Sequence, residues 1–360
     1  MSDIPIIELS GSPEEMGEAF GEAFKEETRQ LTESRIENLI RFIGRHAPDR
    51  AVSRRSILES IGRTVAAHES FDAAIWSEFC GIARAADLAV EELLIGNGYT
   101  DLRDIVLFAG PADAPSEHTG ECSAFLVPAD LARDHRPIVG QTWDMTENTR
   151  PFLVLVRRKP IDAPETVCLT TTGCLCLIGM NSEGVAVGNT NLIPTDARPG
   201  VNYLFAITRA LTCSSAEDAI YVIERTPRAS GHFFYAADGN TALNIETTAA
   251  RTHRTVVEDG VFVHTNHYLS DELRRIEFVG KWLENTRWRY QKLGEKLGEL
   301  SPPLELETCS RQLAAVTQDK VEVGTSLSST LATVGQCPGE GTLMVWAGGA
   351  DEGDPTVLSV

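Results

Sequence analysis

The spacing of apolar residues divides the chain into a helical first third and a mixed remainder. Between residues 16 and 43 the apolar positions recur mostly three or four apart, which predicts a long amphipathic helix. This helix begins with a capping-box sequence, Ser12-Pro13-Glu14-Glu15, that has proline at the first helical position. Two more helices and a last short one are predicted over residues 53–68, 73–88 and 90–94.

A stretch with two prolines and mostly small or acidic residues, 110–117, interrupts the helical pattern and predicts an exposed linker. After Cys122 the apolar period becomes alternating, as in strands. Strands are predicted at residues 138–140, 152–156, 167–170, 175–178, 185–187, 233–235, 242–245, 261–263, 330–334 and 342–346. Helices are predicted at residues 203–211, 216–225, 271–297 and 307–316. This order favours an α+β fold with two packed sheets and helices outside them.

The composition is typical of a soluble globular protein, with 42% hydrophobic and 23% charged residues. A formal net charge of -20 argues against nucleic acid and anionic membranes as partners, because phosphate groups are bound by clustered Lys and Arg. No apolar run approaches the roughly 18 residues that span a bilayer. Residues 1–5 lack the basic and apolar parts of a signal peptide. We therefore expect a cytoplasmic protein.

The eight cysteines include no C-x-x-C pair and no grouping with histidine at zinc-ligand spacing. Neither a metal nor another cofactor is expected, and a reducing compartment disfavours disulfides. Cys174 and Cys176 stand two apart in a predicted strand and are interpreted as buried thiols.

Cys122 occupies a position where a nucleophile could be held rigidly. It follows a turn-forming Gly120 and precedes the apolar run at 124–127, so it would stand at the start of a strand. Its thiol could attack the carbonyl of Glu121, and hydrolysis would then release a chain beginning at Cys122. The new α-amino group has an unperturbed pKa of about 7.7 to 8 and could accept the thiol proton. The alternative interpretation is a small buried hydrophobe.

Motifs along nearly the whole chain resemble those of the isopenicillin N acyltransferase-like family of N-terminal-nucleophile (Ntn) hydrolases. The matching segments are residues 11–17, 120–123, 140–144, 188–192, 264–267 and 330–334. The resemblance implies a four-layer αββα sandwich with a helical N-terminal chain, and a precursor that cuts itself before the cysteine. Its two products, a helical segment of residues 1–121 and a core of residues 122–360, would stay together as a heterodimer, with higher oligomers possible.

The resemblance also implies three catalytic residues. Cys122 matches the nucleophile. Asp144 matches an acid that would hold the new ammonium group and raise its pKa, although Thr142 replaces the commoner asparagine of that segment. Asn266 matches an amide expected to donate to the tetrahedral oxyanion. A turn acid and a plain loop asparagine are the alternatives for Asp144 and Asn266.

Four polar residues are candidates for substrate binding. Asn189 and Asn191 stand two apart, so they would face the same side of a strand end and line the pocket or cap a turn. Ser230 falls where relatives place a small residue near the site. His267 could contact substrate or serve as a structural histidine. The family pattern also includes an arginine near the C-terminus, and residues 324–329 contain none, which leaves substrate recognition open.

The function that these motifs favour is hydrolysis of a small N-acyl or peptide-like amide through a thioester at Cys122. An acyltransferase that moves the acyl group to an amine uses the same catalytic parts. An uncleaved binding protein without activity is a second alternative. An ordinary cysteine hydrolase of the Cys-His-Asn type is a third. It is disfavoured because His264 and His267 lie in a motif that fits the amide role of Asn266 better.

Overall fold

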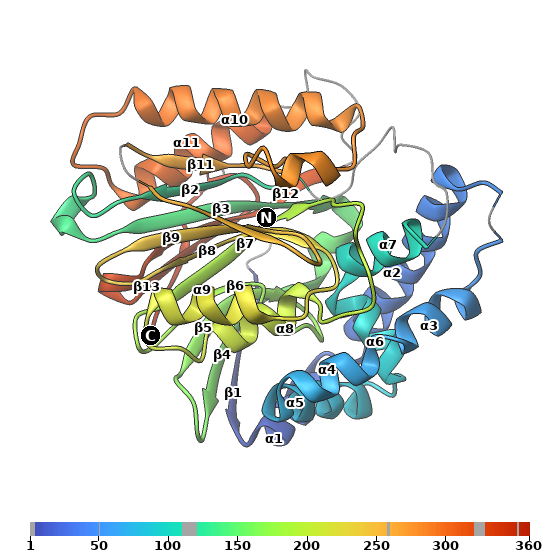
Figure 1. Cartoon of the computed structure of the whole chain (residues 1–360). Helices are drawn as coiled ribbons and strands as arrows, with labels where there is room; N and C mark the ends of the chain where they lie inside the picture. The colour runs from blue at the N-terminus through green and yellow to red at the C-terminus, as the bar shows by residue number, and fades with distance from the viewer. Residues whose placement is uncertain (1–3, 50, 110–120, 258–259, 320–327, 351–352) are drawn as a thin grey trace.

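The computed structural model of this protein describes residues 4–49, 51–109, 121–257, 260–319, 328–350 and 353–360. Within them the chain builds two sheets with helices around them (Figure 1). The eight-stranded sheet has the order β1 (Ile6–Gly11), β4 (Leu153–Pro160), β5 (Thr166–Thr171), β6 (Ile178–Asn181), β7 (Ala186–Leu192), β8 (Gly231–Ala237), β9 (Ala242–Thr247) and β10 (Thr252–Thr255). The six-stranded sheet has the order β11 (Phe262–His264), β2 (Ala124–Val127), β3 (Ile138–Thr146), β12 (Ser328–Cys337), β13 (Thr342–Ala347) and β14 (Thr356–Ser359).

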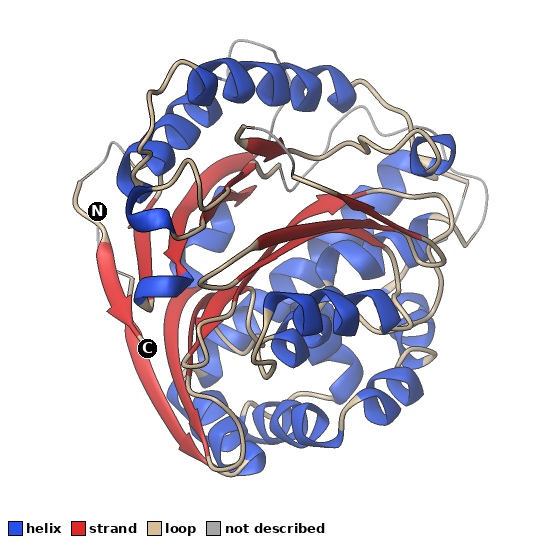
Figure 2. Cartoon of the chain, turned by 60° about the vertical axis from the view of Figure 1, so that its left-hand side comes forward, coloured by secondary structure: helices blue, strands red, loops and turns tan. Residues whose placement is uncertain are grey.

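The two sheets face each other, and helices cover their outer sides (Figures 1 and 2). On the larger sheet, α8 (Tyr203–Ala210) contacts β7, and α9 (Ala216–Arg225) contacts β8 and β9. On the smaller sheet, α10 (Trp282–Gly298) contacts β11, and α11 (Leu306–Asp319) contacts β3 and β12. Between the sheets, Gln141 of β3 donates to the carbonyl of Asn189 in β7 over 2.8 Å. This is the αββα arrangement that the resemblance implies, and the fold prediction is confirmed.

The N-terminal segment lies beside the sandwich and contributes both helices and a strand (Figure 1). Its helices are α1 (Pro13–Ala23), α2 (Lys25–His46), α3 (Arg54–Gly62), α4 (Val65–Phe71), α5 (Ala73–Ala85), α6 (Val90–Asn97) and α7 (Tyr99–Leu107). The long predicted helix is two helices, because Phe24 leaves helical backbone angles between α1 and α2. The capping box at Ser12 is present. Strand β1, which the apolar pattern did not predict, pairs in parallel with β4 of the core.

Two predictions beyond Cys122 need correction. Residues 175–177 are not a strand, because their backbone groups bind side chains instead of a neighbouring strand: Leu175 N–H donates to Asn97 Oδ1 over 2.8 Å and Cys176 N–H to Thr208 Oγ1 over 3.1 Å. The predicted helix at 271–297 begins only at Trp282, after a short 3-10 turn and an extended stretch. The linker at 110–117 lies outside the described residues.

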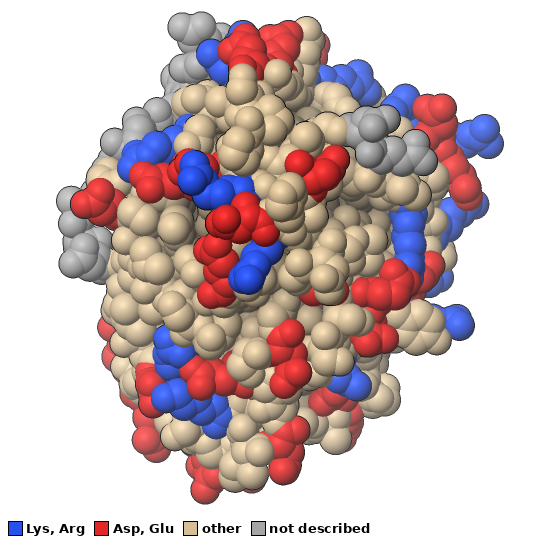
Figure 3. Space-filling view, turned by 90° about the vertical axis from the view of Figure 1, so that its left-hand side faces the viewer, with Lys and Arg blue, Asp and Glu red and all other residues tan. Residues whose placement is uncertain are grey.

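Charged side chains of both signs are interspersed on the face shown in Figure 3, and no basic patch gathers there. Among the described helices, none is long and apolar enough to cross a bilayer. On this face, therefore, the chain has a surface of mixed charge in spite of its net negative charge.

Candidate active site

Cys122 lies two residues before β2, and its backbone is fixed on both sides. Its N–H donates to Oδ1 of Asn266 over 2.7 Å, and its carbonyl oxygen accepts from Nη1 of Arg289 over 2.8 Å. The next residue is bound to β3, because Ser123 N–H donates to Oγ1 of Thr142 over 3.1 Å. The Cys122 side chain is buried. The candidate nucleophile is thus held by the sheet and its neighbours.

Three polar partners fix the orientation of the Asn266 amide. Its Oδ1 accepts from the N–H of Cys122 and also from Nη2 of Arg289 over 3.0 Å. Its Nδ2 donates to the carbonyl oxygen of Asn191 over 2.9 Å. Its own backbone N–H donates to Oγ1 of Thr286 in α10 over 2.7 Å. The amide oxygen, and not the amide nitrogen, therefore faces the backbone nitrogen of Cys122.

Arg289 links α10 to the start of β2 and is fully buried. Besides the bonds to Asn266 and to the carbonyl of Cys122, its Nη1 donates to Ser123 Oγ over 2.9 Å and its Nε to Asn285 Oδ1 over 2.7 Å. Asn285 and Arg289 stand four residues apart, so one face of α10 presents both toward the sheet. All three nitrogens of this guanidinium have acceptors.

A cavity of about 20 Å³ lies beside Cys122. Its volume admits about one water molecule. The N-terminal helices and the core both contribute to its wall, which includes Arg35 of α2, Tyr99 of α7, Trp143 of β3, Asn189 and Asn191 of β7, Tyr203 of α8 and His232 of β8. Asn189 and Asn191 thus lie on the cavity side of β7, next to the cysteine. Their role in binding substrate stays a prediction.

Burial controls the charge on the wall formed by α7 and β8. Burial, with a smaller effect from Arg103, lowers the pKa of His232 to about 3, so this imidazole is neutral at pH 7. Burial and the neighbouring Asp104 raise the pKa of Asp101 well above its usual range. The Asp101 carboxyl accepts from the N–H of Tyr203 over 2.9 Å at the start of α8. This wall therefore carries no imidazolium at neutral pH.

Two acids of the predicted site, Glu121 and Asp144, are both buried. Asp144 lies in β3, two residues beyond Thr142, and pairs with Thr330 next to a bulge in β12. Oε2 of Glu121 accepts from Oγ of Ser328, the first residue of β12, over 3.2 Å. Both acids therefore lie where β3 and β12 meet the residues before β2. The role of Asp144 and the cleavage after Glu121 remain predictions.

Ser230 and His267 have partners away from the cavity. Oγ of Ser230 donates to Oδ2 of Asp104 over 2.6 Å. Nδ1 of His267 lies 3.1 Å from Oγ1 of Thr265 and 3.2 Å from Oγ1 of Thr286. Burial lowers the pKa of His267 to about 3. These contacts favour the structural alternative for His267 and place Ser230 between α7 and β8; a contact of either residue with substrate stays a prediction.

Two buried arginines of the site, Arg35 and Arg289, were not predicted. The arginine that the family pattern has near the C-terminus is absent from residues 324–329. Of these residues, 324–327 lie outside the described part of the chain. A signal for both was present in the sequence. Arg35 stands four residues after Leu31 and Arg289 four residues before Leu293, so helical periodicity places each on a buried stripe.

The interpretation of Cys174 and Cys176 as buried thiols is confirmed. Cys174 and Cys176 are buried, and Sγ of Cys174 donates to the carbonyl of Gly96 over 3.1 Å. In the part of the chain that the structure describes, no cluster of three or more His, Cys, Asp or Glu side chains could hold a metal ion.

Residues 131–351, more than half of the chain, match the acyl-coenzyme A:6-aminopenicillanic acid acyl-transferase family. The chain belongs to this family. It is also 25% identical over 197 residues to the 40 kDa form of acyl-coenzyme A:6-aminopenicillanic-acid-acyltransferase from Emericella nidulans, a match that covers 54% of this chain and 52% of the relative. The chain thus matches about half the length of this relative. The family match confirms the resemblance found in the motifs.

Two solved structures are similar over part of the fold. A mutant of conjugated bile acid hydrolase from Clostridium perfringens has a TM-score of 0.39 at 11% identity and covers 66% of this chain and 92% of its own. Penicillin V acylase from Agrobacterium tumefaciens has a TM-score of 0.41 at 12% identity and covers 66% of this chain and 84% of its own. Neither likeness bears on the residues of the site.

Proposed function

We propose that the protein is a self-processing enzyme that cleaves small amides through a thioester at Cys122. In maturation, the Cys122 sulfur attacks the carbonyl carbon of Glu121, the C–N bond between these residues breaks, and the nitrogen takes up a proton. Water then hydrolyses the resulting thioester and leaves a free thiol and a free amine on Cys122. The observation that carries this proposal is the bond from Cys122 N–H to Asn266 Oδ1, because the same oxygen would hold the new amine.

The matured cysteine would supply both nucleophile and base. Its α-amine takes the thiol proton, the sulfur attacks the substrate carbonyl, and the leaving amine receives the proton as the C–N bond breaks. Asp144 would raise the pKa of the α-ammonium, whereas the nearby positive charge of Arg289 would lower it toward neutrality. Asn266, whose Nδ2 carries a second N–H besides the one bound to Asn191, would donate to the oxyanion.

The contacts between the two segments support a heterodimer after cleavage. The N-terminal segment adds β1 to the larger sheet in parallel with β4, and Asn97 of α6 bonds to the backbone of both Gly173 and Leu175. Both segments also line the cavity at Cys122. We therefore propose that residues 1–121 and 122–360 remain one functional protein.

Acyl transfer is a second candidate, and the family match is the observation that favours it. Transfer and hydrolysis share the thioester and differ in whether water or an amine attacks it. Incubation of the matured enzyme with an amide substrate and a series of amines, followed by mass spectrometry of the products, separates them. A new acyl amine indicates transfer, and free acid alone indicates hydrolysis.

A denaturing gel of the purified wild type and of Cys122→Ala tests the proposal. We expect the wild type to separate into residues 1–121 and 122–360, and Cys122→Ala to stay intact. An intact wild type that still cleaves amides would instead support an ordinary cysteine hydrolase. His264 argues against that alternative, since its Nδ1 lies 3.0 Å from Thr190 Oγ1 and its Nε2 3.0 Å from Glu246 Oε1. An intact and inactive wild type would indicate a binding protein.

A further inference from the structure

We propose that Arg35 binds a carboxylate of the substrate, so that the preferred amides of this enzyme are anionic. This inference rests on the proposed function and specifies the chemical class of its substrate. It also assigns a recognition role to the N-terminal segment, because Arg35 belongs to α2.

Arg35 reaches the nucleophile's cavity from a buried helix face. It is 6% exposed and lies one turn from Leu31 and from Leu39, both of which are buried. Its side chain lines the same small cavity as Cys122, together with Tyr203. Burial raises the pKa of the Tyr203 hydroxyl, and the nearby Arg35 guanidinium opposes this rise. A cation thus lines the cavity beside the proposed nucleophile.

The hydrogen bonds of Arg35 are fewer than its five N–H donors could form. Its Nη1 donates to the carbonyl of Gly96 and lies 3.7 Å from Sγ of Cys174. Its Nε is buried without a hydrogen-bond partner among the described residues. None of the ion pairs found in the described part of the chain involves this guanidinium.

Other buried arginines show how unusual this is. Arg158 pairs with the carboxylate of Glu78, and Arg103 with that of Asp104. Arg228 and Arg289 lack such a carboxylate, but their Nε and both Nη atoms donate to oxygen atoms. Arg35 alone among these five combines burial, the absence of a paired carboxylate and an unpartnered Nε.

A buried charge without a counter-ion is unfavourable, and a carboxylate that pairs with it removes the penalty. The planar guanidinium presents parallel N–H donors that match the two oxygens of a carboxylate. Oδ1 of Asn189, which lines the same cavity, is also buried without a partner among the described residues and could accept an N–H of the substrate. Arg35 and Asn189 thus provide a donor set and an acceptor for an N-acyl compound that carries a carboxylate.

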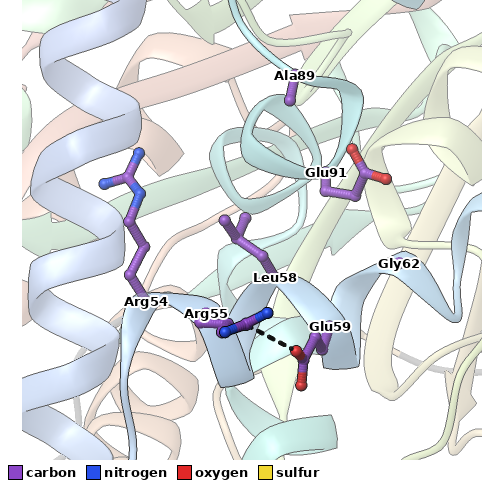
Figure 4. A pocket seen from close by; sticks show the side chains of 7 residues that line it. All are labelled: Arg54, Arg55, Leu58, Glu59, Gly62, Ala89 and Glu91. Atoms are coloured by element: carbon purple, nitrogen blue, oxygen red, sulfur yellow. Dashed lines mark ion pairs between the residues drawn. The ribbon is translucent and has the colours of Figure 1, made fainter.

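Two other hollows of the described chain are not lined by an unpaired arginine. One lies beside α3 (Figure 4), where Arg54 pairs with Glu33 and Glu92, and Arg55 lies 3.3 Å from Glu59. The other is lined by Arg158, whose charge is paired with Glu78. The arginines of these hollows are already paired with carboxylates. The cavity at Cys122 has the unpaired cation and the nucleophile together.

Two thiol reagents that differ in charge test the proposal on the matured enzyme without knowledge of the substrate. Iodoacetate and iodoacetamide alkylate the same sulfur, and mass spectrometry of the peptide that begins at Cys122 gives each rate. We expect Arg35→Met to lower the ratio of the iodoacetate rate to the iodoacetamide rate about tenfold or more. Arg54→Met, which removes an equal charge from α3, should leave the ratio unchanged. An equal ratio in wild type and Arg35→Met would overturn the proposal.

A second measurement needs no variant and so does not depend on how Arg35→Met folds. The wild type is assayed with N-acyl amino acids and with the corresponding neutral carboxamides. We expect kcat/KM to be about tenfold or more higher for the free acids, in line with a charge-assisted hydrogen bond. Equal values for the two series would refute the carboxylate site and leave the proposed function intact. A wild-type chain that stays uncut and cleaves neither series would refute the proposed function itself.

Discussion

The two buried arginines near Cys122 serve opposite sides of the cysteine. Arg289 contacts its backbone side, where the guanidinium donates to Asn285, Asn266, Ser123 and the carbonyl of Cys122 itself. Arg35 lies on the cavity side, where one nitrogen contacts Gly96 and Cys174 and Nε has no partner among the described residues. The two residues share charge and burial but differ in how fully their donors are used.

The number of unbound donors distinguishes an arginine that positions its neighbours from one that can bind a ligand. A guanidinium whose donors are all bound to protein fixes the geometry of its partners and has little capacity left for a ligand. A guanidinium with free donors beside a nucleophile keeps its capacity for a ligand at the cost of a less favourable empty site. The site therefore has a rigid side that holds Cys122 and an open side that would select the substrate.

The largest expected effect concerns the amide on the rigid side. Asn266→Ala should lower kcat by about 100-fold to 1000-fold, the usual loss for one oxyanion donor, and should slow self-cleavage because it also removes the acceptor for Cys122 N–H. The rates of self-cleavage and of amide hydrolysis measure this. Asn285→Ala, which removes only a partner of Arg289, is the matched control and should have a smaller effect. An Asn266→Ala enzyme within twofold of wild type would contradict the role of this residue.

The next effect is on stability. Arg289→Met leaves several buried oxygen atoms without a charged donor and should lower the free energy of unfolding by about 3 kcal/mol, measured by urea denaturation. It should also raise the pKa of the Cys122 ammonium, so that the acidic limb of the kcat/KM profile moves to higher pH. Arg287→Met, at an exposed position of the same helix, is the control. Equal stability of the two variants would mean that the bonds of Arg289 are not needed.

A third prediction concerns His68, which joins the N-terminal segment to α8. Its Nδ1 donates to the Thr64 carbonyl over 2.8 Å, and its Nε2 accepts from Asn202 N–H over 3.0 Å. Burial lowers its pKa from 6.5 to about 4, so the unfolded chain binds the proton first as the pH falls. Its stabilising effect should be complete above pH 6.5 and be lost between there and about pH 4.

We expect this loss to be on the order of 3 kcal/mol in the wild type. His68→Gln should show a shallower decline of unfolding free energy over the same pH range. Urea denaturation at several pH values gives both slopes. Identical slopes would show that His68 titrates with its ordinary pKa.

The smallest effect is expected on the open side. Arg35→Met should change the free energy of unfolding by less than about 1 kcal/mol, and could raise it, because replacing an uncompensated buried charge by an apolar side chain is often neutral or favourable. Urea denaturation beside Arg289→Met gives the comparison directly. A loss as large as that of Arg289→Met would make Arg35 a structural residue and remove the contrast between the two sides.

The periodic elements of the fold could be predicted from the sequence because each depends on nearby residues. The apolar spacing predicted α5, α9 and most core strands, and the motif order predicted the αββα arrangement. It did not predict β1, whose partner β4 lies more than a hundred residues later. The apolar pattern also wrongly predicted a strand at residues 175–177. No neighbouring residue indicates that the side chains of Asn97 and Thr208 bind the backbone groups of this stretch.

The same limit applies to the site. Cys122 and Asn266 stand in recognisable motifs, and the structure brings them within one hydrogen bond. Arg289 lies 167 positions from Cys122 and carries no motif of its own. Arg35 looked like one polar residue in an amphipathic helix. Their positions on buried stripes were visible in the sequence, but which side of Cys122 each would face depends on how helices from two segments pack around it.

Intact-mass analysis and N-terminal sequencing of catalytically active protein test the central claim most directly. The account predicts two chains in the active sample, the second of which begins at Cys122 with a free α-amino group. Cys122→Ala, purified in the same way, should give one uncut chain. An active protein in which residue 122 is still joined to Glu121 would contradict the account, because its proposed base would not exist.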